Sequence, residues 1–147
     1  MIADFRDLLA ALNEAGVRCL VVGAHALAAH GVPRVTGDLD VWVEPTPANA
    51  TRVWRALAAF GAPLASLNIG EADFARPDQV IQLGLPPFRI DILTSVSGVD
   101  FPTAWTGRLS GTLFDVPVSF IGREAFIQNK RASGRPKDLD DIRSLGL

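Results

Sequence analysis

Two aspartates separated by one residue stand in a short alternating segment, Gly37-Asp38-Leu39-Asp40-Val41. Alternation of this kind is typical of a β-strand, in which residues i and i+2 share a face and lie about 6 to 7 Å apart. Two carboxylates so placed can bind one divalent cation, or a pair of cations roughly 4 Å apart. Leu39 and Val41 point to the opposite face, so the core would aim both acids. The alternative is a solvated strand face that carries ordinary surface acids.

A third acid lies inside another apolar segment, Arg89-Ile90-Asp91-Ile92-Leu93. A carboxylate in the middle of an apolar strand is costly unless it is paired or binds a cation. If the two strands are neighbours, Asp91 joins Asp38 and Asp40 in a set of oxygen ligands that suits Mg²⁺ or Mn²⁺. The alternative for Asp91 is an ion pair with Arg89 or with a C-terminal arginine.

A glycine ends an apolar run ahead of the aspartates, in Val21-Val22-Gly23-Ala24-His25-Ala26. The pattern predicts a strand followed at once by a helix, whose free N–H groups and positive dipole end can bind phosphate. Gly23 would let a ligand approach the backbone closely. Many helix starts that bind no ligand share this pattern.

The elements that must position these residues follow from hydrophobic periodicity and from glycine and proline breakers. We expect helices at 5–12, 25–30, 47–60, 123–132 and 137–145, and strands at 17–22, 38–44, 80–84, 88–93 and 116–121. Residues 63–77 are expected to be an irregular surface excursion, and Leu85-Pro86-Pro87 to join two strands. This order predicts an α/β (α+β) fold, a β-sheet backed by helices, in one domain spanning 1–147.

The composition limits the classes of function. The chain has 147 residues, 48% hydrophobic and 20% charged, and a net charge of -2. This balance argues against broad non-specific binding to nucleic acid, which needs a basic surface, but allows a local basic cleft. The first residues are too charged for a secretory signal and no apolar run could span a membrane, so we expect a cytoplasmic protein with no membrane partner.

Together these segments resemble the nucleotidyltransferase superfamily that includes DNA polymerase beta. Val22-Gly23-Ala24 is followed, after residues 25–37, by Asp38-Leu39-Asp40-Val41, and Asp91 fits the third acid. Further likeness to small bacterial nucleotidyltransferases, some associated with toxin–antitoxin and abortive-infection systems, lies at residues 34–40, 89–94 and 129–138. Ala24 departs from the family pattern, which has Gly or Ser there.

The resemblance implies a nucleotidyltransferase-like mixed sheet with C-terminal helices. It also implies transfer of a nucleoside monophosphate from a nucleoside triphosphate, with ATP as the expected substrate. Asp38 and Asp40 would ligate two Mg²⁺ or Mn²⁺ ions, and Asp91 would ligate one of them and help to activate the acceptor hydroxyl. The acceptor would be a partner protein or the 3′ end of an RNA.

Further nucleotide-binding residues also follow from the resemblance. The backbone N–H groups of Gly23 and Ala24 would face the triphosphate, and Lys130 would contact phosphate. Arg34 and Thr36 are candidates to line the nucleotide cleft. For Lys130 the alternative is a solvated lysine. For the whole chain the alternatives are a non-catalytic module that binds nucleotide or a partner, and a metal-dependent phosphohydrolase that uses the same acids.

Overall fold

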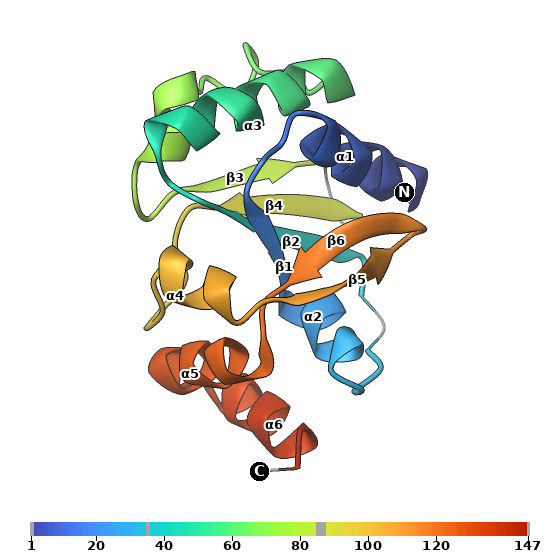
Figure 1. Cartoon of the computed structure of the whole chain (residues 1–147), viewed down its shortest axis with the longest axis vertical. Helices are drawn as coiled ribbons and strands as arrows, with labels where there is room; N and C mark the ends of the chain where they lie inside the picture. Colours follow the sequence, from blue (N-terminus) through green and yellow to red (C-terminus); the bar gives the residue numbers. More distant parts are fainter. Residues whose placement is uncertain (1, 35, 85–87, 147) are drawn as a thin grey trace.

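The computed structural model describes residues 2–34, 36–84 and 88–146, and within them a six-stranded sheet carries helices on both sides (Figure 1). The helices are α1 (Ile2–Glu14), α2 (Gly23–Ala29), α3 (Pro47–Phe60), α4 (Phe101–Thr106), α5 (Arg123–Ser133) and α6 (Pro136–Ser144), with a 3₁₀ helix, η1 (Glu71–Ala75). The strands are β1 (Cys19–Val22), β2 (Asp38–Val43), β3 (Val80–Leu83), β4 (Arg89–Leu93), β5 (Leu109–Leu113) and β6 (Val116–Phe120).

The sheet is mixed, with the strand order β3-β4-β2-β1-β6-β5. β2 runs parallel to β4 and antiparallel to β1, and β1 runs parallel to β6. The outer strands β3 and β5 each pair antiparallel with their inner neighbour. The expected α/β (α+β) class, a mixed sheet backed by helices with two helices at the C-terminal end, is therefore confirmed.

Hydrophobic side chains of the central strands meet the helices on each side. Figure 1 shows α1 and α3 on one side of the sheet, and α2, α4, α5 and α6 on the other. Leu39, Val41 and Val43 of β2 are fully buried. The start of α3 is capped: the Thr46 side chain accepts a hydrogen bond from the Asn49 N–H at 3.3 Å, and Pro47 opens the helix.

All ten predicted helices and strands are present, with ends shifted by at most three residues, but three short elements were not predicted. These are α4, β5 and η1. Residues 63–77 lie mostly at the surface, as predicted, but they are not wholly irregular, because η1 carries Phe74, which is fully buried. β5 escaped the sequence pattern since its central Gly111 and mostly exposed residues give no hydrophobic alternation. The predicted connection Leu85-Pro86-Pro87 lies outside the described residues.

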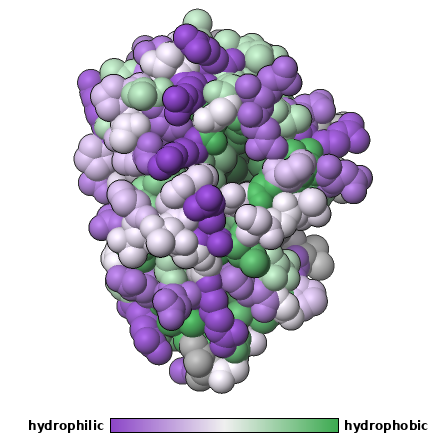
Figure 2. Space-filling view, in the orientation of Figure 1, coloured by the Kyte–Doolittle hydropathy of each residue, from purple (hydrophilic) through white to green (hydrophobic). Residues whose placement is uncertain are grey.

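The visible surface is mostly hydrophilic, with hydrophobic side chains gathered around a hollow (Figure 2). A cavity of about 410 Å³ lies between α1 and the strands β1, β5 and β6, and Leu9, Leu12 and Val21 contribute to its wall. None of the three aspartates lines this cavity. No helix in the described part of the chain is both long and apolar enough to cross a membrane.

Candidate functional site

The pairing of β2 with β4 brings the three aspartates to one place. In the parallel register Asp40 lies opposite Asp91, and Asp38 lies opposite Arg89. Residues opposite each other on paired strands have Cβ atoms about 5 Å apart and share a face. The Asp91 side chain is 11% exposed, whereas the Asp38 side chain is 41% exposed. The site therefore opens to solvent at Asp38 and closes at Asp91.

Arg89 forms ion pairs with two of the three acids. Its Nη2 lies 3.1 Å from Asp91 Oδ2 and 3.5 Å from Asp38 Oδ2. Its Nε lies 3.0 Å from Asp91 Oδ1. The ion pair between Asp91 and Arg89, expected from the sequence as an alternative to metal binding, is thus formed in this structure. It supplies one positive charge against three carboxylates.

Asp40 has the clearest electrostatic perturbation of the site. Burial, followed by the negative charges of Asp91 and Asp38, raises the pKa of Asp40 from 3.8 to about 6, and the positive charge of Arg89 opposes this rise. Like charges held on adjacent strands disfavour the ionised form in the same way as desolvation does. Asp40 thus lies in surroundings, buried and beside two other acids, that favour its protonated form.

Gly23 leaves the space that the Asp40 carboxylate fills. Gly23 begins α2 with a φ of +72°, and Val22 beside it pairs with Asp40 across the β1–β2 ladder. A Cβ at position 23 would collide with Asp40 Oδ2. The glycine is needed both for its left-handed backbone and for the room it gives to an acid. Ala24 follows in the first turn of α2, which receives no side-chain cap.

The carboxylates of Asp38, Asp40 and Asp91 are ligands of the type that a hard divalent cation binds, although they are not already grouped around a metal position. Asp91 Oδ1 is buried and accepts no hydrogen bond within the described residues. Carboxylate oxygens are the ligands that Mg²⁺ and Mn²⁺ prefer. No group of three His, Cys, Asp or Glu side chains in residues 2–34, 36–84 and 88–146 is already disposed to hold a metal ion. Ligation of metal by Asp38, Asp40 and Asp91 stays a prediction.

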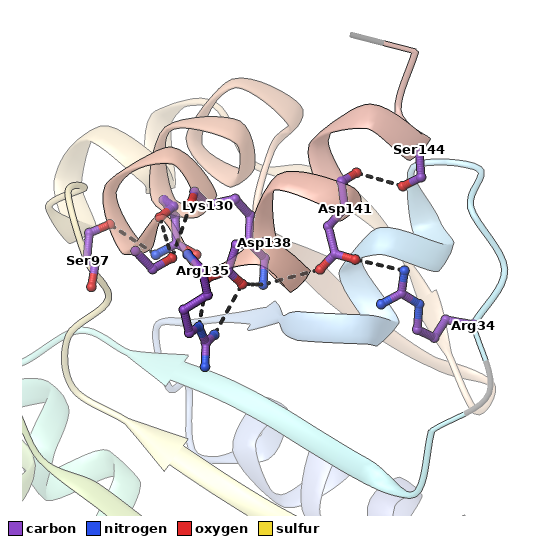
Figure 3. Close-up of polar contacts among 9 residues, drawn as sticks. Arg34, Ser97, Lys130, Arg135, Asp138, Asp141 and Ser144 are labelled. Carbon is purple, nitrogen blue, oxygen red and sulfur yellow. Dashed lines mark hydrogen bonds and ion pairs between the residues drawn. The ribbon is translucent and has the colours of Figure 1, made fainter.

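Two other predicted residues, Arg34 and Lys130, lie together in an ion-pair network at the C-terminal helices (Figure 3). Arg34 Nη2 lies 2.8 Å from Asp141 Oδ1, and Lys130 Nζ lies 3.6 Å from Asp141 Oδ2. Lys130 Nζ also lies 3.4 Å from Asp138 Oδ1, and Arg135 Nε lies 2.7 Å from Asp138 Oδ2. The solvated alternative for Lys130 was wrong, because its side chain is only 13% exposed.

Both acids of this network are buried, which makes the cations around them necessary. Asp138 is 0% exposed and Asp141 is 3% exposed. Hydrogen bonds from Arg135 hold the pKa of Asp138 well below its ordinary value. Asp141 was not singled out from the sequence. Its position three residues after Asp138, beside the buried Ile142, places both acids on the inward face of α6 and was the available signal.

Thr36 contacts the start of β2, and His25 of α2 packs among aromatic rings. The Asp38 N–H donates to Thr36 Oγ1 at 3.1 Å, so Thr36 fixes the backbone at the first acid. Burial lowers the pKa of His25, and the nearby backbone of Asp38 opposes this shift. The ring also packs edge-on against Phe5 and Phe114. His25 therefore has a packing role beside Phe5 and Phe114.

Comparison with known proteins found a match by structure but none by sequence. No family model matches the sequence, and no curated protein matches it. The fold is similar to a crystal structure described as a "putative nucleotidyltransferase" from Thermotoga maritima, with a TM-score of 0.63 and 14% sequence identity. The match covers 95% of this chain and 88% of that chain. The chain therefore has a nucleotidyltransferase-like fold.

Proposed function

We propose that this chain is a metal-dependent nucleotidyltransferase. The observation that carries the proposal is the register that sets Asp40 opposite Asp91 on parallel strands, with Asp38 on the same face of β2. Three carboxylates with one neighbouring cation are a poor arrangement for an ordinary folded surface, because like charges repel at this range. The same three carboxylates suit a site in which bound Mg²⁺ or Mn²⁺ would balance their negative charge.

The reaction proposed is transfer of a nucleoside monophosphate from a nucleoside triphosphate, ATP in the first instance, to an acceptor hydroxyl, with pyrophosphate as the leaving group. Bound Mg²⁺ or Mn²⁺ ions would neutralise charge that develops on the phosphate oxygens. Asp38 and Asp40 would hold both ions. Asp91 would hold one of them and orient the acceptor hydroxyl for in-line attack. The open side of the site at Asp38 gives the substrates access.

The residues around the acids have supporting roles in this proposal. Gly23 and Ala24 present backbone N–H groups at the start of α2, where no side chain caps the helix. Thr36 keeps Asp38 in place through its backbone. Arg34 and Lys130 act from the network at α6, where each is partly neutralised by Asp141. Their proposed contact with the nucleotide therefore requires that a triphosphate compete with Asp141.

The proposed acceptor is a partner protein or the 3′ end of an RNA, within a toxin–antitoxin setting. The resemblance of residues 34–40, 89–94 and 129–138 to small bacterial nucleotidyltransferases supports this. Exposed basic residues near the α5–α6 turn, Arg131 and Lys137, offer a small surface for a phosphate backbone. The net charge of -2 confines any such contact to a local patch.

A labelling experiment tests transfer. The protein is incubated with each α-labelled nucleoside triphosphate and with Mg²⁺ or Mn²⁺, using cell lysate as acceptor. We expect label on a protein or RNA band with the wild type, and a loss of at least about 100-fold with Asp40→Asn. Asp140→Asn is the matched control, because Asp140 is an exposed acid of α6 with only an exposed partner, Arg143.

The other outcomes identify the alternatives. Metal-dependent nucleotide binding without transfer, lost in Asp40→Asn, would mean a non-catalytic binding module. Release of free nucleotide products without a labelled acceptor would mean a phosphohydrolase. Absence of both binding and turnover would contradict the proposed function.

A further inference from the structure

The Arg89 guanidinium lies between Asp38 and Asp91, in the position of a bridging cation. Arg89 is opposite Asp38 in the β2–β4 register, and its Nη2 lies 3.5 Å from Asp38 Oδ2 and 3.1 Å from Asp91 Oδ2. Three carboxylates on adjacent strands need positive charge nearby. Among the described residues, Arg89 is the cation that forms ion pairs with these aspartates. It therefore occupies space that a metal ligated by Asp91 would need.

The ion pair is close but imperfectly aligned. Arg89 Nε and Asp91 Oδ1 are 3.0 Å apart and both are buried, yet neither atom makes a hydrogen bond within the described residues. A well-aligned fork between arginine and a carboxylate would satisfy both atoms. Arg89 Nε and Asp91 Oδ1 are thus both left without a hydrogen bond. Separating the two side chains therefore breaks fewer hydrogen bonds than separating a well-aligned pair would.

The side chain of Arg89 can move while its backbone stays fixed. Arg89 is the first residue of β4, and its N–H donates to the Gly37 carbonyl at 3.2 Å. About one third of its side chain is exposed, compared with 11% for Asp91. Rotation of the guanidinium toward solvent therefore requires no change in strand pairing. Asp91, by contrast, is the central residue of β4.

We propose that Arg89 is the resident counter-cation of the metal-free site, and that a divalent cation reaches Asp91 by displacing the Arg89 guanidinium. The inference rests on the proposed function, because it assumes that Asp38, Asp40 and Asp91 bind metal. Arg89 is then a positioning residue: it balances part of the negative charge on Asp38 and Asp91 before metal arrives. Each divalent cation carries two positive charges where Arg89 carries one, so it balances more of the charge on the three acids.

This competition gives Arg89 substitutions two effects that a purely structural ion pair would not combine. Without metal, loss of Arg89 leaves three acids uncompensated and lowers the melting temperature. With metal, loss of Arg89 removes a competitor and strengthens binding. A merely structural Arg89 would lower the melting temperature and leave metal affinity unchanged or weaker.

The experiment compares wild type with Arg89→Met, which keeps the length of the side chain and removes its charge. The dissociation constant for Mn²⁺ is measured from the electron paramagnetic resonance signal of free Mn²⁺. The melting temperature is measured in EDTA and in excess Mn²⁺. We expect Arg89→Met to bind Mn²⁺ roughly tenfold more tightly. We also expect a lower melting temperature in EDTA and a larger rise with Mn²⁺ than in the wild type.

Three controls make the result specific. Arg143→Met removes an exposed arginine from an exposed pair and should match the wild type in both measurements. Asp40→Asn should abolish Mn²⁺ binding in both backgrounds, which identifies the measured site. Arg89→Gln provides a second neutral variant that keeps a hydrogen-bonding head. A variant that folds only when Mn²⁺ is added would be the strongest form of the expected result.

Two outcomes would overturn the inference in distinguishable ways. If Arg89→Met and Arg89→Gln bind Mn²⁺ with the affinity of the wild type or more weakly, Arg89 is no competitor, and the proposed metal site stands. If neither the wild type nor any Arg89 variant binds Mn²⁺, the metal site itself fails, and the inference fails with it.

Discussion

At the scale of single residues, the site depends on a glycine as much as on its acids. Gly23 combines a φ of +72° with direct contact to Asp40, so any side chain there meets two separate obstacles. Gly16 offers a natural comparison, because it has nearly the same φ, +70°, and a Cβ added to it would meet nothing within 4 Å. Substitutions at these two glycines therefore distinguish the free-energy cost of a left-handed backbone from the cost of the collision with Asp40.

We expect Gly16→Ala to lower the free energy of unfolding by about 1 kcal/mol, the cost of a left-handed backbone in a residue other than glycine. Gly23→Ala should cost about 2 kcal/mol more than that, because its Cβ also displaces the Asp40 carboxylate. Urea unfolding of each variant measures both values. In an Asp40→Ala background the extra cost at Gly23 should disappear; an extra cost that persists there would contradict the assignment to Asp40.

At the scale of elements, α6 is joined to the segment that enters β2. The Arg34–Asp141 ion pair connects the residues just ahead of the aspartates to a helix more than 100 positions later in the sequence. Lys130 of α5 shares the same carboxylate, so one acid links three segments (Figure 3). Removal of that acid would leave Arg34 and Lys130 close together without a shared partner.

Asp141→Ala should lower the free energy of unfolding by about 3 kcal/mol, as expected when one partner of a buried ion pair is removed. The adjacent Asp140→Ala removes an acid whose side chain is 69% exposed and should cost less than about 1 kcal/mol. Chemical denaturation of the two variants side by side provides the measurement. Equal losses would mean that the buried network contributes no more than a surface pair.

At the scale of the whole molecule, the site makes folding depend on pH. In the folded chain the pKa of Asp40 is raised to about 6 from its ordinary 3.8, so the folded state binds a proton more readily between these values. Asp40 therefore favours the folded state most below about pH 4, and this contribution is lost as pH rises through 6. The lowered pKa of His25 acts in the opposite direction.

Comparing the wild type with Asp40→Asn isolates the effect of Asp40 on the free energy of unfolding, because the other titrating groups are present in both proteins. In EDTA, the free energy of unfolding of the wild type should fall relative to that of Asp40→Asn between pH 4.5 and 6.5. Denaturant unfolding at several pH values in this range measures the difference, in which His25 and Asp138 cancel. Parallel curves for the two proteins would show that Asp40 does not titrate as its surroundings imply.

The sequence predicted what depends on local pattern and missed what depends on distant contacts. Asp38, Asp40 and Asp91 could be placed on strands because alternation and apolar neighbours are visible within five residues. The partners of Arg34 and Lys130 could not be predicted, since Asp141 becomes their neighbour only when α6 folds against the earlier segment. α4 and β5 were missed because a six-residue helix and an exposed strand with a glycine carry little periodicity.

The position of β2 and β4 inside the sheet has a consequence for hydrogen exchange. Each of these strands is paired on both sides, β2 with β1 and β4, and β4 with β2 and β3. The amide protons of β2 and β4 are therefore protected from exchange by local fraying. Exchange of the amide protons of Asp40 and Asp91 should require nearly global unfolding. The acids stay together for as long as the chain is folded, so access to the site is left to side chains such as Arg89.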